Sequence, residues 1–171
     1  MTIVKKIQNF TRKINGIMYG LSIKDDWKLI RKCDVLLIFS DENRGEKLGG
    51  KAYSALMDSI GDEISEKGFK CSRFILPPSH LTGKRAYGEP VSANRTLAFL
   101  AVRRKICQAL CNIFFFKTNS CEMPLRHFYK KLAETSGCKF VLAIHAPQQL
   151  CAQMHSMGIP VFEVLHGPGY N

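Results

Sequence analysis

The stretch KFVLAIHAPQQLCAQMHSMGIPVFEVL, residues 139–165, decides the fold class. Two short apolar runs flank a segment whose apolar residues recur at helical spacing. Pro147 opens that segment and Gly158 closes it, which are the positions at which these residues favour a helix start and a helix end. The pattern predicts a strand at 139–145, a helix at 147–157 and a strand at 159–165. A crossover helix with short connections joins parallel strands, so we expect a βαβ unit in a parallel sheet.

The same alternation of periods recurs toward the amino terminus. Residues 34–40 and 71–76 are apolar runs of strand length, typical of strands buried on both faces of a parallel sheet. Helical spacing predicts further helices at 52–67, 93–116 and 124–136, the second with Ser92 as its N-cap. The pattern predicts a single α/β domain with a Rossmann-like parallel sheet and helices on both faces. The 171 residues, 46% of them hydrophobic, suffice for one such core.

Residues 1–32 are more basic than the rest of the chain. Their pattern predicts a basic amphipathic arm ahead of a domain at 33–171. The arm has a net charge of +6 out of the formal +11 of the chain. Its apolar residues, among them Ile3, Ile7 and Phe10, recur at helical spacing with Lys and Arg between them. Such a helix can bind an anionic membrane surface, or it can pack its apolar stripe on the domain and leave its lysines in water. Both alternatives stay open.

Composition and motifs exclude several classes of protein. The seven cysteines lie mostly in apolar runs and form no C-x-x-C pair, which indicates buried thiols in a reducing compartment and no metal site. Arg103, Arg104 and Lys105 interrupt the most apolar region, so it predicts no membrane span. The strands lack the aromatic motifs of RNA readers, so we expect no nucleic acid partner. We expect a cytoplasmic protein, with peripheral contact at the inner face of the membrane as an option.

Polar residues follow the first predicted strand at its carboxyl end, where open α/β sheets bind ligands. This loop contains Asp41, Asn43 and Arg44, and we place Tyr53 and Ser54 in the first turn of the helix after it. Unpaired amide groups at a helix start suit an anion or a polyol. The phosphate-binding patterns G-x-G-x-x-G and G-x-x-x-x-G-K-[ST] are absent here, so we expect no resident cofactor. A merely solvated loop is the alternative.

Two histidines end neighbouring predicted strands. His145 closes the strand at 139–145 and His166 follows the strand at 159–165, so both can face one crevice. An imidazole titrates near neutral pH, which suits His166 to act as a general base toward a hydroxyl group. A structural role for either histidine is the alternative.

Several motifs together resemble a known family. Asp34–Ile38, Asp41–Arg44 and Gly50–Ser54, followed by the run Gly158-Ile159-Pro160-Val161-Phe162-Glu163-Val164-Leu165-His166-Gly167, resemble the amino-terminal domain of bacterial GT-B-like glycosyltransferases for surface polysaccharide. The resemblance covers about residues 33–171, and Leu165 stands where many relatives carry Gln.

The resemblance implies two Rossmann-like domains facing across a cleft, the first binding the acceptor and the second the nucleotide-sugar donor. It implies that His166 is the catalytic base. Because parallel strands deliver their following loops to one edge of the sheet, we expect the substrate-binding residues to be Asp41, Asn43, Arg44, Tyr53, Ser54, His145 and Gly167.

We therefore expect an amino-terminal fragment of an enzyme that moves a sugar from a nucleotide-sugar donor to a carbohydrate or lipid-linked acceptor. The sequence ends at Asn171, shortly after the His-Gly motif, so we expect the donor domain to be missing and the chain to be inactive alone. The alternative is a stand-alone Rossmann-like or flavodoxin-like binding module that docks a partner chain.

Overall fold

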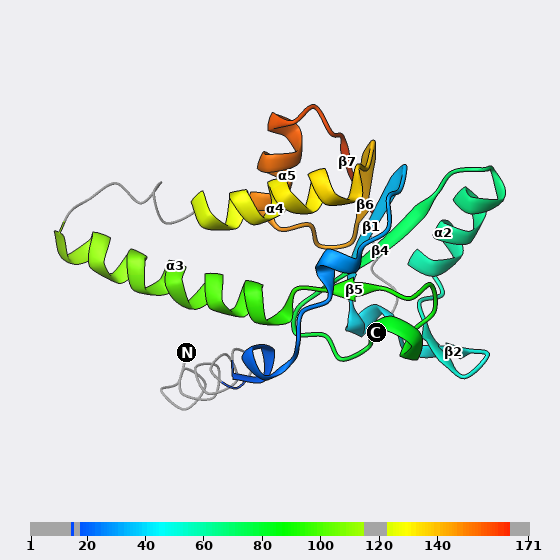
Figure 1. Ribbon diagram of the computed structural model, residues 1–171, viewed down its shortest axis with the longest axis horizontal. Helices are drawn as coiled ribbons and strands as arrows, with labels where there is room; N and C mark the ends of the chain where they lie inside the picture. Colours follow the sequence, from blue (N-terminus) through cyan, green and yellow to red (C-terminus); the bar gives the residue numbers. More distant parts are fainter. Residues whose placement is uncertain (1–14, 16–17, 115–122, 165–171) are drawn as a thin grey trace, which may run out of the picture.

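Five parallel strands form one sheet in the order β5-β4-β1-β6-β7 (Figure 1). The computed structural model describes residue 15 and residues 18–114 and 123–164, with the backbone alone for 109–114. In that order the strands are Val91–Ser92, Cys71–Leu76, Val35–Ser40, Phe140–Ala143 and Val161–Glu163. Along β1 the register runs from Val35 opposite Cys71 and Phe140 to Ser40 opposite Leu76. The predicted parallel α/β sheet is confirmed.

Helices cover both faces of the sheet, as predicted (Figure 1). On one face α2 packs against the odd-numbered residues of β1, and on the other face α4 and α5 pack against the even-numbered ones. A turn of 3-10 helix, η1, and the start of α3 pack on the same face of the sheet as α4 and α5. The bounds are Trp27–Leu29 for η1, Met57–Glu66 for α2, Asn94–Phe114 for α3, Met123–Ser136 for α4 and Gln148–Ser156 for α5.

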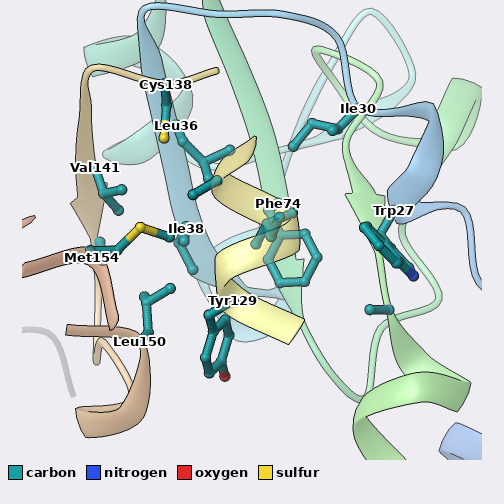
Figure 2. Close-up of a cluster of buried hydrophobic side chains, with 14 of the residues drawn as sticks. Trp27, Ile30, Leu36, Ile38, Phe74, Tyr129, Cys138, Val141, Leu150 and Met154 are labelled. Carbon is teal, nitrogen blue, oxygen red and sulfur yellow. The ribbon is translucent and has the colours of Figure 1, made fainter. Parts of the chain in front are cut away.

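The larger core lies between the sheet and the layer of α4 and α5. Figure 2 shows Leu36 and Ile38 of β1, Phe74 of β4 and Val141 of β6 facing Tyr129, Leu150 and Met154. All seven side chains are buried, because the helices pack directly on the sheet and exclude water from the space between the two layers.

The segment before β1 belongs to this core. Trp27 and Ile30 are buried (Figure 2). The Trp27 ring meets the Phe128 ring of α4 edge to face, with 5.2 Å between the ring centroids. The core therefore begins before residue 33, the boundary that the charge pattern suggested. The amphipathic helix expected toward the start of the arm falls mainly on residues 1–14 and 16–17, outside the described residues.

Two predictions about how helices begin are wrong. Residues 52 and 53, expected in a helix, belong to a hairpin of β2, Glu46–Leu48, and β3, Lys51–Tyr53, and α2 begins only at Met57. The two-residue turn Gly49-Gly50 has positive φ at both positions, which suits a tight hairpin and stops a helix from starting here. Ser92 lies in β5 and does not cap α3.

Within the described residues, no helix combines the length and the apolar character that crossing a membrane requires.

Candidate functional site at the carboxyl edge of the sheet

The sheet has a topological switch point between β1 and β6. The chain leaves β1 toward α2 on one face and leaves β6 toward α5 on the other, so the two following loops diverge. Open α/β sheets bind ligands outside the carboxyl ends of the strands at this position. The Ile144 N–H donates to the Ile38 carbonyl at 2.9 Å and holds the two strand ends together. Of the predicted site residues, Asp41 and Asn43 follow β1 and His145 follows β6.

The loop after β1 is a turn held by Asn43. Its Oδ1 accepts hydrogen bonds from the Ser40 backbone N–H at 3.3 Å and from the Ser40 hydroxyl at 3.0 Å. These bonds close the short 3-10 turn η2, Asp41–Asn43. Local side-chain bonds of this kind favour turns over regular structure, so Ser40-Asp41-Glu42-Asn43 ends the strand here.

Asp41 joins this loop to the one that follows β4. Its carboxylate accepts hydrogen bonds from the Ser79 hydroxyl at 2.9 Å and from the His80 backbone N–H at 3.0 Å. The Nδ1 atom of His80 lies 3.5 Å from the same carboxylate, and 61% of the His80 side chain is exposed. The edge thus presents an imidazole to solvent beside a largely buried carboxylate.

Ser79 and Asn94 extend the link to the start of α3. Asn94 Oδ1 accepts from the Ser79 N–H at 2.7 Å, and Asn94 Nδ2 donates to the Ser79 carbonyl at 2.8 Å. Both residues are buried. The loops after β1, β4 and β5 therefore form one connected polar edge.

Arg44 points away from this edge into the protein. Its side chain is fully buried, with Nη2 3.2 Å from Asp58 Oδ1 and 3.1 Å from the Tyr87 carbonyl. The guanidinium lies over the Phe39 ring at 5.0 Å, and Nε and Nη1 have no hydrogen-bond partner among the described residues. Burial lowers the pKa of Arg44 below its ordinary value, an effect opposed by the charge of Asp58. We assign Arg44 to the scaffold and correct its expected substrate contact.

Asp58 is the centre of that scaffold. It also accepts from Arg73 Nε at 2.7 Å, and Arg73 Nη2 continues to Asp62 at 3.2 Å. Gly88 lies against Arg73 so closely that a Cβ there would be 2.4 Å from the guanidinium, and its φ of 68° suits glycine. This cluster ties α2 and β4 to the loop before β5.

Tyr53 and Ser54 lie outside the first turn of α2, which corrects their predicted position. Tyr53 ends β3 and meets the Tyr87 ring edge to face at 5.1 Å. Ser54 is buried; its N–H donates to Asp58 Oδ2 at 2.8 Å and its hydroxyl accepts from the Met57 N–H at 3.1 Å. We assign Ser54 to the scaffold, while Tyr53 remains half-buried beside the hairpin.

His145 is exposed and lies two residues beyond the end of β6. Its φ of 54° is left-handed, a conformation that few residues other than glycine and asparagine adopt easily. This turn directs the chain from β6 into α5. His166 and Gly167 lie outside the described residues, so their proposed roles stay predictions.

The described cysteines are free thiols. Cys33 and Cys138 are buried, whereas Cys71, Cys107 and Cys151 are half-buried. Burial raises the pKa of the Cys33 thiol to about 11. In the described part of the chain, no three His, Cys, Asp or Glu residues gather as metal ligands.

A hollow of about 550 Å³ lies elsewhere, beside the amino-terminal half of β4. Ser72, Arg73, Arg31 and Glu89 line it together with Lys51 of the hairpin. Arg31 and Glu89 pair across it at 2.7 Å on exposed side chains. None of the predicted site residues borders this hollow.

Comparison with models of protein families, with curated proteins and with solved structures found no match.

Sequence reasoning missed Ser79, His80 and Asn94 at this edge. A usable signal existed for two of them, because Ser79-His80 follows the predicted strand at 71–76 in the same way that Asp41 follows the first strand. No signal singled out Asn94, whose partner is 15 residues earlier in the chain.

Proposed function

We propose that this domain is the acceptor-side domain of a GT-B-like glycosyltransferase for surface polysaccharide. The observation that carries the proposal is the switch point between β1 and β6, bordered by the Asp41–His80 pair and by His145. Carboxylate, amide and imidazole groups are the side chains that recognise sugar hydroxyls by hydrogen bonds. The motif resemblance supplies the reaction class, which is transfer of a sugar from a nucleotide-sugar donor to a carbohydrate or lipid-linked acceptor.

In this proposal His166 is the general base. It removes the proton of an acceptor hydroxyl while the hydroxyl oxygen bonds to the anomeric carbon of the donor sugar. The bond from that carbon to the phosphate oxygen breaks, and the nucleoside diphosphate leaves with the electron pair. Since a separate donor domain holds the nucleotide, we expect this chain to bind acceptor without turnover.

An NMR titration of the labelled chain tests the proposal. Oligosaccharide fragments of bacterial surface polysaccharides should shift the backbone amides of residues 41–44, 79–80 and 145, and nucleotide-sugars should leave them unshifted. His145→Asn should weaken this binding, because asparagine keeps the left-handed backbone and removes the imidazole. His155→Asn, on the exposed last turn of α5, is the matched control and should bind like the unaltered chain.

Shifts confined to another surface, or equal weakening by both histidine variants, would remove the carboxyl edge as the acceptor site. Turnover of a nucleotide-sugar by this chain would contradict the need for a donor domain. Binding to a protein partner with no sugar binding would favour the alternative, a binding module that docks a partner chain.

A further inference from the structure

Helix α3 exposes a stripe of alternating basic and apolar side chains. Arg95, Phe99, Arg103 and Ile106 follow at spacings of four, four and three residues, so they share one face of the helix. All four are exposed, Phe99 to 58% and Ile106 to 56%. Leu97 and Leu100, on the other side of the helix, are half-buried and pack toward the core.

The amino-terminal segment adds apolar side chains to this helix. Residues 18–22 are helical and lie against the first turns of α3 (Figure 1). Gly20 packs so closely that a Cβ there would lie 3.0 Å from Ala98 Cβ, and Arg95 Nε donates to the Leu21 carbonyl at 3.1 Å. Met18 and Tyr19, beside this contact, are 62% and 45% exposed. Large apolar side chains thus remain in water on a segment that is already docked.

The charged side chains of α3 itself all have the same sign. Between Asn94 and Phe114 the helix carries Arg95, Arg103, Arg104 and Lys105 and has no Asp or Glu. Helix α3 also extends well beyond the sheet, which leaves its exposed side open to a large flat partner (Figure 1). Basic residues interleaved with exposed apolar ones match the interface of an anionic bilayer, where headgroups meet the cations and apolar side chains enter the acyl boundary.

We infer that Met18, Tyr19 and the stripe Arg95-Phe99-Arg103-Ile106, together the α3 surface, bind an anionic membrane surface. A nucleic acid would satisfy the arginines through its phosphates, yet it would leave the aliphatic side chains of Met18 and Ile106 without an apolar partner. A bilayer accepts both kinds of side chain. The inference stands apart from the proposed function, because it uses none of the residues at the carboxyl edge.

Co-sedimentation of the full chain with lipid vesicles tests the inference. Vesicles of phosphatidylglycerol and phosphatidylcholine should bind the protein, added salt should weaken this binding, and vesicles of phosphatidylcholine alone should bind at least about tenfold less. The double variant Phe99→Ser, Ile106→Ser and the single variant Arg103→Glu should each lose about tenfold in affinity for the anionic vesicles. Circular dichroism would verify that each variant keeps its helical content.

The matched control is Phe69→Ser with Lys67→Glu. These exposed residues follow α2, on the other face of the sheet, and combine the same two chemistries. The control should bind like the unaltered chain. The inference fails if the chain ignores anionic vesicles, if the control loses as much affinity as the α3 variants, or if the α3 variants keep full affinity. Binding of duplex DNA or RNA that is lost in Arg103→Glu and retained in Phe99→Ser, Ile106→Ser would assign the surface to nucleic acid instead.

Discussion

At the scale of single residues, Asp58 determines how the loop behind the candidate site is built. Its fully buried carboxylate lies between the guanidinium groups of Arg44 and Arg73 and also accepts the Ser54 N–H. Removing these charges from water is costly, and their mutual attraction offsets the cost only while every partner stays in place. Loss of Asp58 would therefore destabilise the protein mainly because Arg44 and Arg73 would remain buried without their anion.

We predict that Asp58→Ala lowers the free energy of unfolding by about 3–5 kcal/mol, because it leaves two buried cations without their anion. Urea denaturation followed by circular dichroism measures the change. Asp62→Ala is the comparison: this carboxylate also pairs with Arg73 but is 36% exposed, so its loss should cost about 1 kcal/mol. Similar losses in both variants would show that Asp58 has no special role.

At the scale of elements, the start of α3 shows a cap supplied from far away in the sequence. The nearby polar side chains are engaged elsewhere, since the Ser92 hydroxyl donates to the Ile75 carbonyl and the Asn94 amide pairs with Ser79. Asp25 accepts the N–H groups of Arg95 at 2.7 Å and Thr96 at 3.0 Å. These are among the donors that a helix start leaves unpaired, and an acidic cap also suits the helix dipole.

Asp25→Ala should cost about 1 kcal/mol of unfolding free energy, as expected for a lost helix cap. Asp25→Asn keeps an acceptor oxygen and should restore most of this stability. Thermal and urea unfolding of the two variants beside the unaltered chain would measure both effects. If alanine and asparagine destabilise equally, the hydrogen bonds to α3 are not what Asp25 contributes.

At the scale of the whole molecule, the segment ahead of β1 completes one end of the core. Trp27 and Ile30 share the main hydrophobic cluster with Phe128 of α4, and Asp26 pairs with Ser92 of the edge strand β5. The segment is thus packed on the domain through apolar burial and hydrogen bonds together. Large aromatic side chains dominate the energetics of such contacts.

A chain that begins at residue 33 should fail to fold cooperatively. It would lose the buried Trp27 side chain, whose deletion alone typically costs about 3–5 kcal/mol, and would lose the cap on α3 as well. Domains of ordinary stability have only about 5–15 kcal/mol in total. A chain that begins at residue 18 keeps these contacts and should unfold in one transition. Cooperative thermal unfolding of the shorter chain by circular dichroism would disprove this boundary.

Part of the candidate site was visible in the sequence. Asp41, Asn43 and His145 were expected at the carboxyl edge because each follows a strand, and parallel strands deliver their following loops to one edge. Arg44 and Ser54 were expected in the same place, but both are buried, because each donates a hydrogen bond to the buried carboxylate of Asp58. The residues next to Arg44 in the sequence do not indicate that its partner is Asp58, 14 residues further along the chain.

The order and type of the main strands and helices followed from the sequence alone. A fully buried strand is a continuous run of apolar residues, and in a helix that packs on the core the apolar residues recur every three to four positions. Both patterns can be read from a short stretch of sequence. Only the tertiary structure decided that Ser79, His80 and Asn94 join the carboxyl edge, that Asp58 and its partners support it, that Asp25 caps α3, and that Trp27 belongs to the core. Each of these depends on a contact between residues far apart in the chain, and the energy of such a contact exists only once both partners have been brought together and removed from water.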